Sequence, residues 1–235
     1  MIEVRRDKDI YEKEGGWFRA RWHFSFDEYR DPKWVQFGSL RVFNDDRLVP
    51  GVAWPMHPHR DIEGITYVVE GTFRHADNLG GDHQILPAGS AQRMSLGRGS
   101  WHSEQNASET EPMRFIQMWI MPREQGLEPA VEQKVFTKED RTGRLLRVVS
   151  PEGGDAVLVH QDASVYVSAL PPRSSVSHKF GQEYGGYLYV IEGAIRLNGE
   201  ELRTGDAAKI EDEPEITIEA EQPSELIMAK VRLED

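Results

Sequence analysis

Short apolar segments separated by turn residues run along most of the chain and predict an all-β protein. Three of these segments are rich in β-branched and aromatic residues and have the length of strands, namely residues 64–69, 115–120 and 187–191. The 21 glycine and 13 proline residues are scattered between such segments instead of being gathered in linkers. Many short strands with turn signals between them are typical of a barrel or a sandwich.

Two shorter patterns refine this picture. Asn198 and Gly199 separate two strand-like runs, and this pair favours a tight hairpin because both residues tolerate positive φ angles. The polar stretch 123–133 predicts a connection with one helical turn. No long amphipathic helix is indicated.

An internal repeat divides the chain in two. Tyr67–Gly71 (YVVEG) recurs as Tyr189–Gly193 (YVIEG), an offset of 122 residues. The turn Leu86–Gly89 recurs as Leu202–Gly205, at an offset of 116, so the loop between the two signals is shorter in the second half. Each half therefore reads as hairpin, turn and hairpin, which is the pattern of a small barrel.

We predict two barrels in tandem, residues 1–135 and residues 136–235. The boundary lies in the connection between Pro122 and about residue 150, because boundaries drawn from sequence are loose by a few residues. It is also soft for a second reason, since the first strands of the two barrels can be exchanged between the halves.

Composition narrows the chemistry. The chain has no cysteine, so disulfides and thiolate ligands are excluded, and any metal must be held by His, Asp or Glu. Such ligands suit Fe, Mn, Ni, Cu or Zn. The formal net charge of −12 makes direct binding to nucleic acid unfavourable, because an acidic surface repels phosphate.

No apolar run approaches bilayer length, so we expect no membrane partner. The charged start of the chain does not resemble a secretory signal. We therefore expect a cytoplasmic protein.

The sharpest candidate for chemistry is the pair His57 and His59. Residues i and i+2 of a strand share a face, with Cα atoms about 6–7 Å apart, so both imidazoles can reach one ion. A second i, i+2 pair is formed by His102 and Glu104. If the two pairs face each other on neighbouring strands, three imidazoles and one carboxylate converge, and an octahedral metal keeps two positions open. A lone His-x-His pair is more often an accident of sequence, and it is the second pair that favours a site.

The repeat provides an internal control. At the repeat offsets, the four candidate ligands correspond to Lys179, Gly181, Ile218 and Ala220, none of which matches them. His178 lies one position away and is expected on the other face. We therefore expect a degenerate second barrel without metal.

The motifs quoted so far resemble the pirin family. The resemblance rests on residues 37–46 (FGSLRVFNDD), 57–63 (HPHRDIE), 67–71 (YVVEG), 97–104 (GRGSWHSE) and 117–120 (QMWI). The opening at 22–26 (WHFSF) and the ending at 119–122 (WIMP) are most similar to the bacterial branch of that family. The resemblance is specific over residues 15–122 and weaker to the end of the chain.

This resemblance implies a tandem cupin (bicupin) fold with one metal site in the N-terminal barrel, held by His57, His59, His102 and Glu104. It also implies a quercetin 2,3-dioxygenase activity, in which a flavonol's central ring is opened by O₂ with release of carbon monoxide. Iron is the usual metal in pirin, so we expect Fe(II), with Cu, Ni, Mn, Co or Zn as alternatives. No organic cofactor is expected.

The chain departs from the wider cupin pattern in two places. That pattern expects an acidic ligand at position 64, where this chain has Gly64, with Glu63 one position away. It also expects a histidine where Gln92 stands, and His102 comes later. Both departures agree with pirins and leave Glu104 as the carboxylate ligand.

Three functions stay open from the sequence. The first is a dioxygenase acting on a phenolic substrate, with Glu104 either a metal ligand alone or also the catalytic base that takes the hydroxyl proton. The second is a redox-responsive regulatory protein that binds a protein partner without turnover. The third is a cupin with non-oxidative Lewis-acid chemistry. The physiological substrate, the metal in the cell and the oligomeric state are not determined.

Other residues near these motifs have simpler interpretations. We expect His23 to be a core histidine, His75 and His83 to be exposed beside a glycine-rich loop, and Arg60 to be a solvated or ion-paired side chain. Core packing is the default expectation for Met94, Phe115, Gln117 and Trp119.

Overall fold

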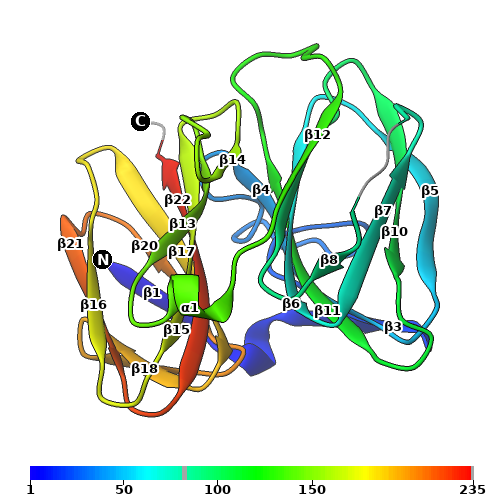
Figure 1. Cartoon of the computed structure of the whole chain (residues 1–235). Helices are drawn as coiled ribbons and strands as arrows, with labels where there is room; N and C mark the ends of the chain where they lie inside the picture. Colours follow the sequence, from blue (N-terminus) through cyan, green and yellow to red (C-terminus); the bar gives the residue numbers. More distant parts are fainter. Residues whose placement is uncertain (81–83, 234–235) are drawn as a thin grey trace.

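The computed structural model describes residues 1–80 and 84–233. Within these residues almost every regular element is a strand, and the strands form two barrels that lie side by side (Figure 1). The all-β prediction and the tandem arrangement are confirmed. Only two short helices occur among the described residues, the 3₁₀ turn η1 (Asp7–Asp9) and the one-turn helix α1 (Lys138–Arg141).

The first barrel consists of two antiparallel sheets. The larger has the order β12-β9-β6-β11-β4-β3-β2, formed by β2 (Tyr11–Glu14), β3 (Phe18–Trp22), β4 (Leu40–Leu48), β6 (Glu63–Glu70), β9 (Ala91–Ser95), β11 (Met113–Ile120) and β12 (Ala130–Lys134). The smaller has the order β5-β10-β7-β8, formed by β5 (Ala53–His59), β7 (Thr72–Asp77), β8 (Leu86–Pro87) and β10 (Ser100–Asn106).

The second barrel repeats this plan. Its larger sheet has the order β1-β20-β17-β22-β15-β13-β14, formed by β1 (Ile2–Arg5), β13 (Leu146–Ser150), β14 (Val157–Leu158), β15 (Ala163–Leu170), β17 (Tyr184–Glu192), β20 (Ala207–Ile210) and β22 (Ser224–Arg232). Its smaller sheet has the order β16-β21-β18-β19, formed by β16 (Ser175–Lys179), β18 (Ala194–Leu197), β19 (Glu200–Arg203) and β21 (Glu215–Ala220).

Strand membership does not follow chain order at the N-terminus. β1 pairs with β20, with Ile2 opposite Ile210, so the first strand of the chain completes the sheet of the second barrel (Figure 1). β2 and β3 then join the first barrel. The division into residues 1–135 and 136–235 stays a prediction, and residues 2–5 lie outside it as far as sheet pairing is concerned.

Two local predictions have different outcomes. Asn198 and Gly199 connect β18 to β19 with φ angles of 47° and 90°, as the hairpin prediction requires. The polar stretch 123–133 has no helical turn and instead contributes most of β12, which pairs with β9. The reason is tertiary, because an available strand edge offers backbone hydrogen bonds whatever the polarity of the side chains. The helical turn forms later, at α1.

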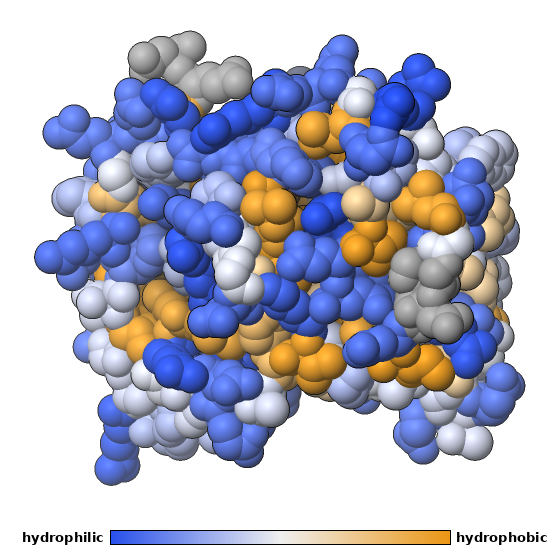
Figure 2. All heavy atoms as spheres, turned by 45° about the horizontal axis from the view of Figure 1, so that its top comes forward, coloured by the Kyte–Doolittle hydropathy of each residue, from blue (hydrophilic) through white to orange (hydrophobic). Residues whose placement is uncertain are grey.

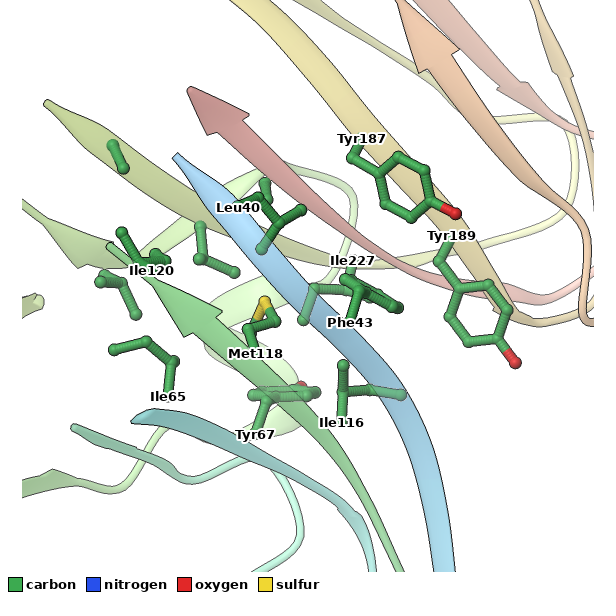
Figure 3. Close-up of a cluster of buried hydrophobic side chains, with 14 of the residues drawn as sticks. Leu40, Phe43, Ile65, Tyr67, Ile116, Met118, Ile120, Tyr187, Tyr189 and Ile227 are labelled. Carbon is green, nitrogen blue, oxygen red and sulfur yellow. The ribbon is translucent and has the colours of Figure 1, made fainter. Parts of the chain in front are cut away.

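The two barrels share one apolar core. Phe43 and Ile116 of the first barrel belong to the same buried cluster as Tyr187, Tyr189 and Ile227 of the second (Figure 3). Burying a large apolar side chain contributes about 1.5–3 kcal/mol. The cluster therefore joins the halves into one packed body and holds β4 and β11 rigidly in place.

Polar side chains are also buried at this junction. His23 is fully buried and its Nδ1 lies 2.8 Å from the Tyr187 hydroxyl oxygen, and burial lowers its pKa to about 3. The expectation of a core histidine is confirmed. Nearby, Asp45 accepts two hydrogen bonds from Arg114, at 2.9 and 2.6 Å, and one from the Tyr189 hydroxyl at 2.6 Å.

The surface is mixed. On the face drawn in Figure 2, polar residues predominate and apolar residues form separate small patches. Within residues 1–80 and 84–233, no helix is long and apolar enough to cross a membrane.

Candidate metal centre

Three imidazoles converge in the first barrel, on two neighbouring strands of the smaller sheet. His57 of β5 stands directly opposite His102 of β10, and His59 stands opposite Ser100. One nitrogen from each of His57, His59 and His102 lies within 4.8 Å of the others. The sequence predicted that the two i, i+2 pairs face each other, and the antiparallel pairing of β5 with β10 brings three of the four side chains, the imidazoles, together.

Two of the three imidazoles, those of His59 and His102, are neutral near pH 7 and so offer lone pairs. Burial lowers the pKa of His59 to about 4 and that of His102 to about 2, and the neighbouring histidines lower both further. His57 Nδ1 lies 2.7 Å from the Pro55 carbonyl oxygen. Because a carbonyl only accepts, Nδ1 carries the proton and Nε2 is left with its lone pair.

The surroundings of His102 indicate that this site suits a metal ion. It is 3% exposed, and neither of its ring nitrogens has a hydrogen-bond partner within the described parts of the chain. A buried polar atom without a partner costs free energy, so an imidazole with two such nitrogens calls for a bound group. Three imidazoles whose nitrogens lie this close together fit a divalent transition metal.

Glu104, the fourth predicted ligand, is buried on the same strand. Its carboxylate does not belong to the group of three imidazoles within 4.8 Å of one another. Oε1 accepts a hydrogen bond from Gln117 Nε2 at 2.6 Å, and Gln117 Oε1 in turn accepts one from the Thr66 hydroxyl at 2.8 Å. Burial raises the pKa of Glu104 to about 7, and the hydrogen bonds that Glu104 accepts from Gln117 and, at 3.5 Å, from the Thr66 hydroxyl oppose the rise. Its role as ligand or base stays a prediction.

The network behind Glu104 leads to a first prediction. Gln117→Leu removes the amide that orients the carboxylate, and partners of this kind commonly contribute about 10–100-fold to metal affinity. We expect that loss for nickel(II), measured by competition with a coloured chelator. Gln36→Leu, at an exposed position, is the control. Equal affinities in the two variants would mean that Gln117 does not position Glu104 for metal binding.

A large cavity opens beside the imidazoles. Its volume is about 1230 Å³, and His57, His59 and Glu104 contribute to its wall. Much of the remaining wall is aromatic, from Phe18 and Trp22 of β3, Phe26, Trp54 of β5 and Trp119 of β11. Concave, mainly apolar pockets with a few converging polar groups are the usual form of small-molecule sites.

Of the four residues expected to pack in the core, two do so and two line the cavity. Phe115 and Met94 are buried in apolar clusters, as expected. Gln117 and Trp119 line the cavity instead. Trp119 also packs edge-on against His59, with ring centroids 4.7 Å apart. Arg60 is exposed.

The expectation for His75 was wrong. It is 3% exposed, because β7 pairs with β10 and brings His75 opposite Glu104. Its Nδ1 is 3.1 Å from the Gln92 amide nitrogen and its Nε2 is 2.9 Å from Asp77 Oδ2, so both ring nitrogens have partners and it does not join the imidazole group. The matching expectation for His83 lies outside the described residues.

The second barrel has a different interior. Ile218 and Ala220, at the positions that correspond to His102 and Glu104, are buried in an apolar cluster. His178 packs between Tyr166 and Phe180, with ring centroids 4.7 and 4.8 Å away. The expectation of a metal-free second barrel stays a prediction that this packing supports.

Sequence reasoning missed two polar residues in the cavity. Asn44 and Asp46 of β4 line it beside Val42. Their alternation with Phe43 and Asp45 was visible in the sequence as a strand pattern. What was not visible is which face of β4 points into the cavity, since Asp45 and Asp46 look alike in one dimension.

Comparison with protein families gives two matches. The family described as Pirin matches residues 4–120, and the family described as Quercetinase C-terminal cupin domain matches residues 147–231. Together they span nearly the whole chain.

Individual proteins match over similar lengths. A quercetin 2,3-dioxygenase from Escherichia coli (strain K12) is 40% identical over 230 residues, which cover 97% of each chain. A pirin-like protein from Caulobacter vibrioides is 39% identical over 228 residues, 94% of this chain and 97% of its own. Among solved structures, bacterial pirin YhhW from Escherichia coli in complex with nickel(II) has a TM-score of 0.92 and 37% identity, with 100% of both chains covered.

Proposed function

Because the chain belongs to the pirin family, we propose that it is a metal-dependent dioxygenase that opens the central ring of a flavonol such as quercetin with O₂ and releases carbon monoxide. The observation that carries this proposal is the meeting of three imidazoles beside a large cavity with a mainly aromatic wall. Full-length relatives named as quercetin 2,3-dioxygenases support an oxidoreductase of this type.

In this proposal His57, His59, His102 and Glu104 hold one divalent metal ion. We infer Fe(II), with Cu, Ni, Mn, Co or Zn as alternatives, and the nickel(II) complex of a relative supports a site that accepts such ions. When bound, the ion would supply Lewis acidity that lowers the pKa of the flavonol 3-hydroxyl and a template for O₂. No cysteine competes as a ligand.

The chain's own residues bind and orient the substrate. The rings of Trp22, Trp54 and Trp119 offer flat apolar surfaces to a planar aromatic molecule and exclude water from it. Gln117 fixes the orientation of the Glu104 carboxylate. A carboxylate beside the metal can take the proton of the 3-hydroxyl, which makes Glu104 the candidate base in addition to ligand.

The test is an aerobic assay of the purified protein loaded in turn with Fe(II), Mn(II), Ni(II) and Cu(II), and metal analysis beforehand gives the ion that co-purifies. The expected result is loss of quercetin absorbance with equimolar O₂ uptake and carbon monoxide release. His57→Ala, treated with metal in the same way, serves as the inactive control.

Other results would favour the alternatives. Tight metal binding without turnover of any phenol favours a regulatory protein with a protein partner. Turnover under strict anaerobiosis favours non-oxidative Lewis-acid chemistry. A cytoplasmic location and the absence of nucleic-acid binding stay predictions from composition.

A further inference from the structure

One face of β4 carries polar groups into the cavity. Side chains alternate along a strand, so Val42, Asn44 and Asp46 share the face that lines the cavity. Asp45, on the other face, is engaged by Arg114 and Tyr189 at the junction of the barrels. The two neighbouring aspartates therefore have different surroundings.

Asn44 and Asp46 are buried without protein partners. They are 4% and 6% exposed, and within residues 1–80 and 84–233 neither side chain has a hydrogen bond or ion pair. Oδ1 of Asn44 is closed off from solvent as well. Since leaving a buried polar atom unsatisfied costs free energy, Oδ1 of Asn44 requires an explanation.

The surroundings do not provide that explanation. On β11, Gln117 stands opposite Asn44 and Phe115 stands opposite Asp46. On β3 the opposite residues are Trp22 and Ala20. Only Gln117 is polar among these four, and its amide is already used by Thr66 and Glu104. The remaining partners for the β4 groups are water or a ligand in the cavity.

We propose that Asn44 and Asp46 form a second polar subsite of the cavity, which binds hydroxyl groups of a polyhydroxylated flavonol other than its reacting 3-hydroxyl. This inference rests on the proposed function for the identity of the ligand. The carboxyl of Asp46 accepts a hydrogen bond from a phenolic hydroxyl whether or not it is protonated, and the amide of Asn44 offers a donor and an acceptor. Because β4 belongs to the larger sheet and the imidazole strands β5 and β10 to the smaller, this subsite would fix which part of the flat ligand faces the imidazoles.

Recognition of this kind is selective. A site built to hydrogen-bond a substrate hydroxyl discriminates against an analogue that lacks it, because the buried polar groups of the site are then left unpaired. An all-apolar cavity of the same shape would bind both ligands with similar affinity. The ratio of the two affinities is therefore the property that the subsite controls.

The test uses the full-length, metal-loaded protein and two ligands. Quercetin carries several hydroxyls, whereas 3-hydroxyflavone keeps the reacting ring and has no other hydroxyl. Dissociation constants are measured in the absence of O₂ from the quenching of tryptophan fluorescence. This signal is sensitive to a bound ligand because three tryptophans lie in the cavity wall. We expect the wild type to prefer quercetin and Asp46→Leu to lower that preference about tenfold.

Further variants separate recognition from folding. Asp46→Asn keeps an acceptor and is expected to retain most of the preference, and Asn44→Leu is expected to lower it. Val42→Ala, on the same face of β4, is the control and should change both affinities in proportion. Asp46→Leu should unfold at the same temperature as the wild type or higher, because it removes a buried carboxyl without a partner.

The outcomes are distinguishable from those of the proposed function. An affinity ratio that stays unchanged in both Asp46→Leu and Asn44→Leu overturns the subsite, and so does failure of quercetin to bind. If the ratio falls as expected but quercetin is never consumed in air, the subsite stands and the dioxygenase proposal fails.

Discussion

Replacing His102 with alanine is expected to reduce metal affinity by more than about 100-fold. Loss of a residue that only hydrogen-bonds to a metal ligand already costs about 10–100-fold, and this change removes a ligand itself. His102 is the most buried imidazole of the three and the one whose two ring nitrogens lack partners in the described residues. Metal analysis after dialysis should fall from one ion per chain to near zero, and quercetin consumption should fall with it.

The fold should survive this change. In the metal-free protein, the ring nitrogens of His102 are buried without hydrogen bonds. Removing the imidazole therefore loses packing contacts but also removes the free-energy cost of two unsatisfied polar atoms. We expect metal-free wild type and His102→Ala to unfold within a few degrees of each other. His178→Ala is the matched control, because it removes a half-buried imidazole from the second barrel, and it should keep the full metal content. Wild-type metal affinity in His102→Ala would refute the three-imidazole centre.

Asp45→Asn is expected to lower the free energy of unfolding by about 3–5 kcal/mol, measured by urea denaturation. The side chains of Arg114 and Asp45 are only 10% and 4% exposed. Two hydrogen bonds join them. Removing the negative charge leaves the guanidinium buried at the junction of the barrels without its counter-ion. Breaking such a pair costs far more than the pair contributes as a whole, because the desolvation of the remaining charge is no longer offset.

The control is a second aspartate that also contacts one arginine and one tyrosine. Asp162 also accepts from a tyrosine, Tyr184, at 2.6 Å, and lies 3.5 Å from the guanidinium of Arg123, but these side chains are more exposed. Asp162→Asn should cost about 1 kcal/mol or less, since solvent screens an exposed pair. Similar costs for Asp45→Asn and Asp162→Asn would show that burial does not govern the junction.

The pH dependence of this effect has a definite sign. Burial alone would raise the pKa of Asp45, but the hydrogen bonds and charge of Arg114 outweigh it and hold the pKa below the usual 3.8. A carboxyl with a lowered pKa in the folded state stabilises the protein above its unfolded-state pKa and loses that contribution as the pH falls through the folded-state pKa. The difference between wild type and Asp45→Asn should therefore be constant at neutral pH and shrink below about pH 3.8.

Some features could be predicted because they depend on local periodicity. The alternation of His57 with His59 and of His102 with Glu104 places each pair on one face of a strand in any β-structure. The repeat of YVVEG as YVIEG predicted two similar barrels. Asn198 and Gly199 predicted their hairpin because φ preferences belong to the residues themselves.

Other features depend on which strands become neighbours. His75 looked like a loop residue and is buried because β7 pairs with β10. Residues 130–134, although mostly polar, form a strand because the edge of β9 is free to pair. Neither outcome is encoded in the local pattern of apolar and polar residues.

The sequence by itself determined the all-β class, the duplicated barrel and the two i, i+2 pairs of candidate ligands. The class and the pairs follow from residue types at short spacings, and the duplication follows from the internal repeat. Only the tertiary structure decided that the two pairs lie on adjacent strands, that β1 completes the second barrel, and that Asp45 serves the junction while Asp46 faces the cavity. The physical reason is that a strand's period of two says which side chains share a face, whereas the packing of the whole sheet decides what that face meets.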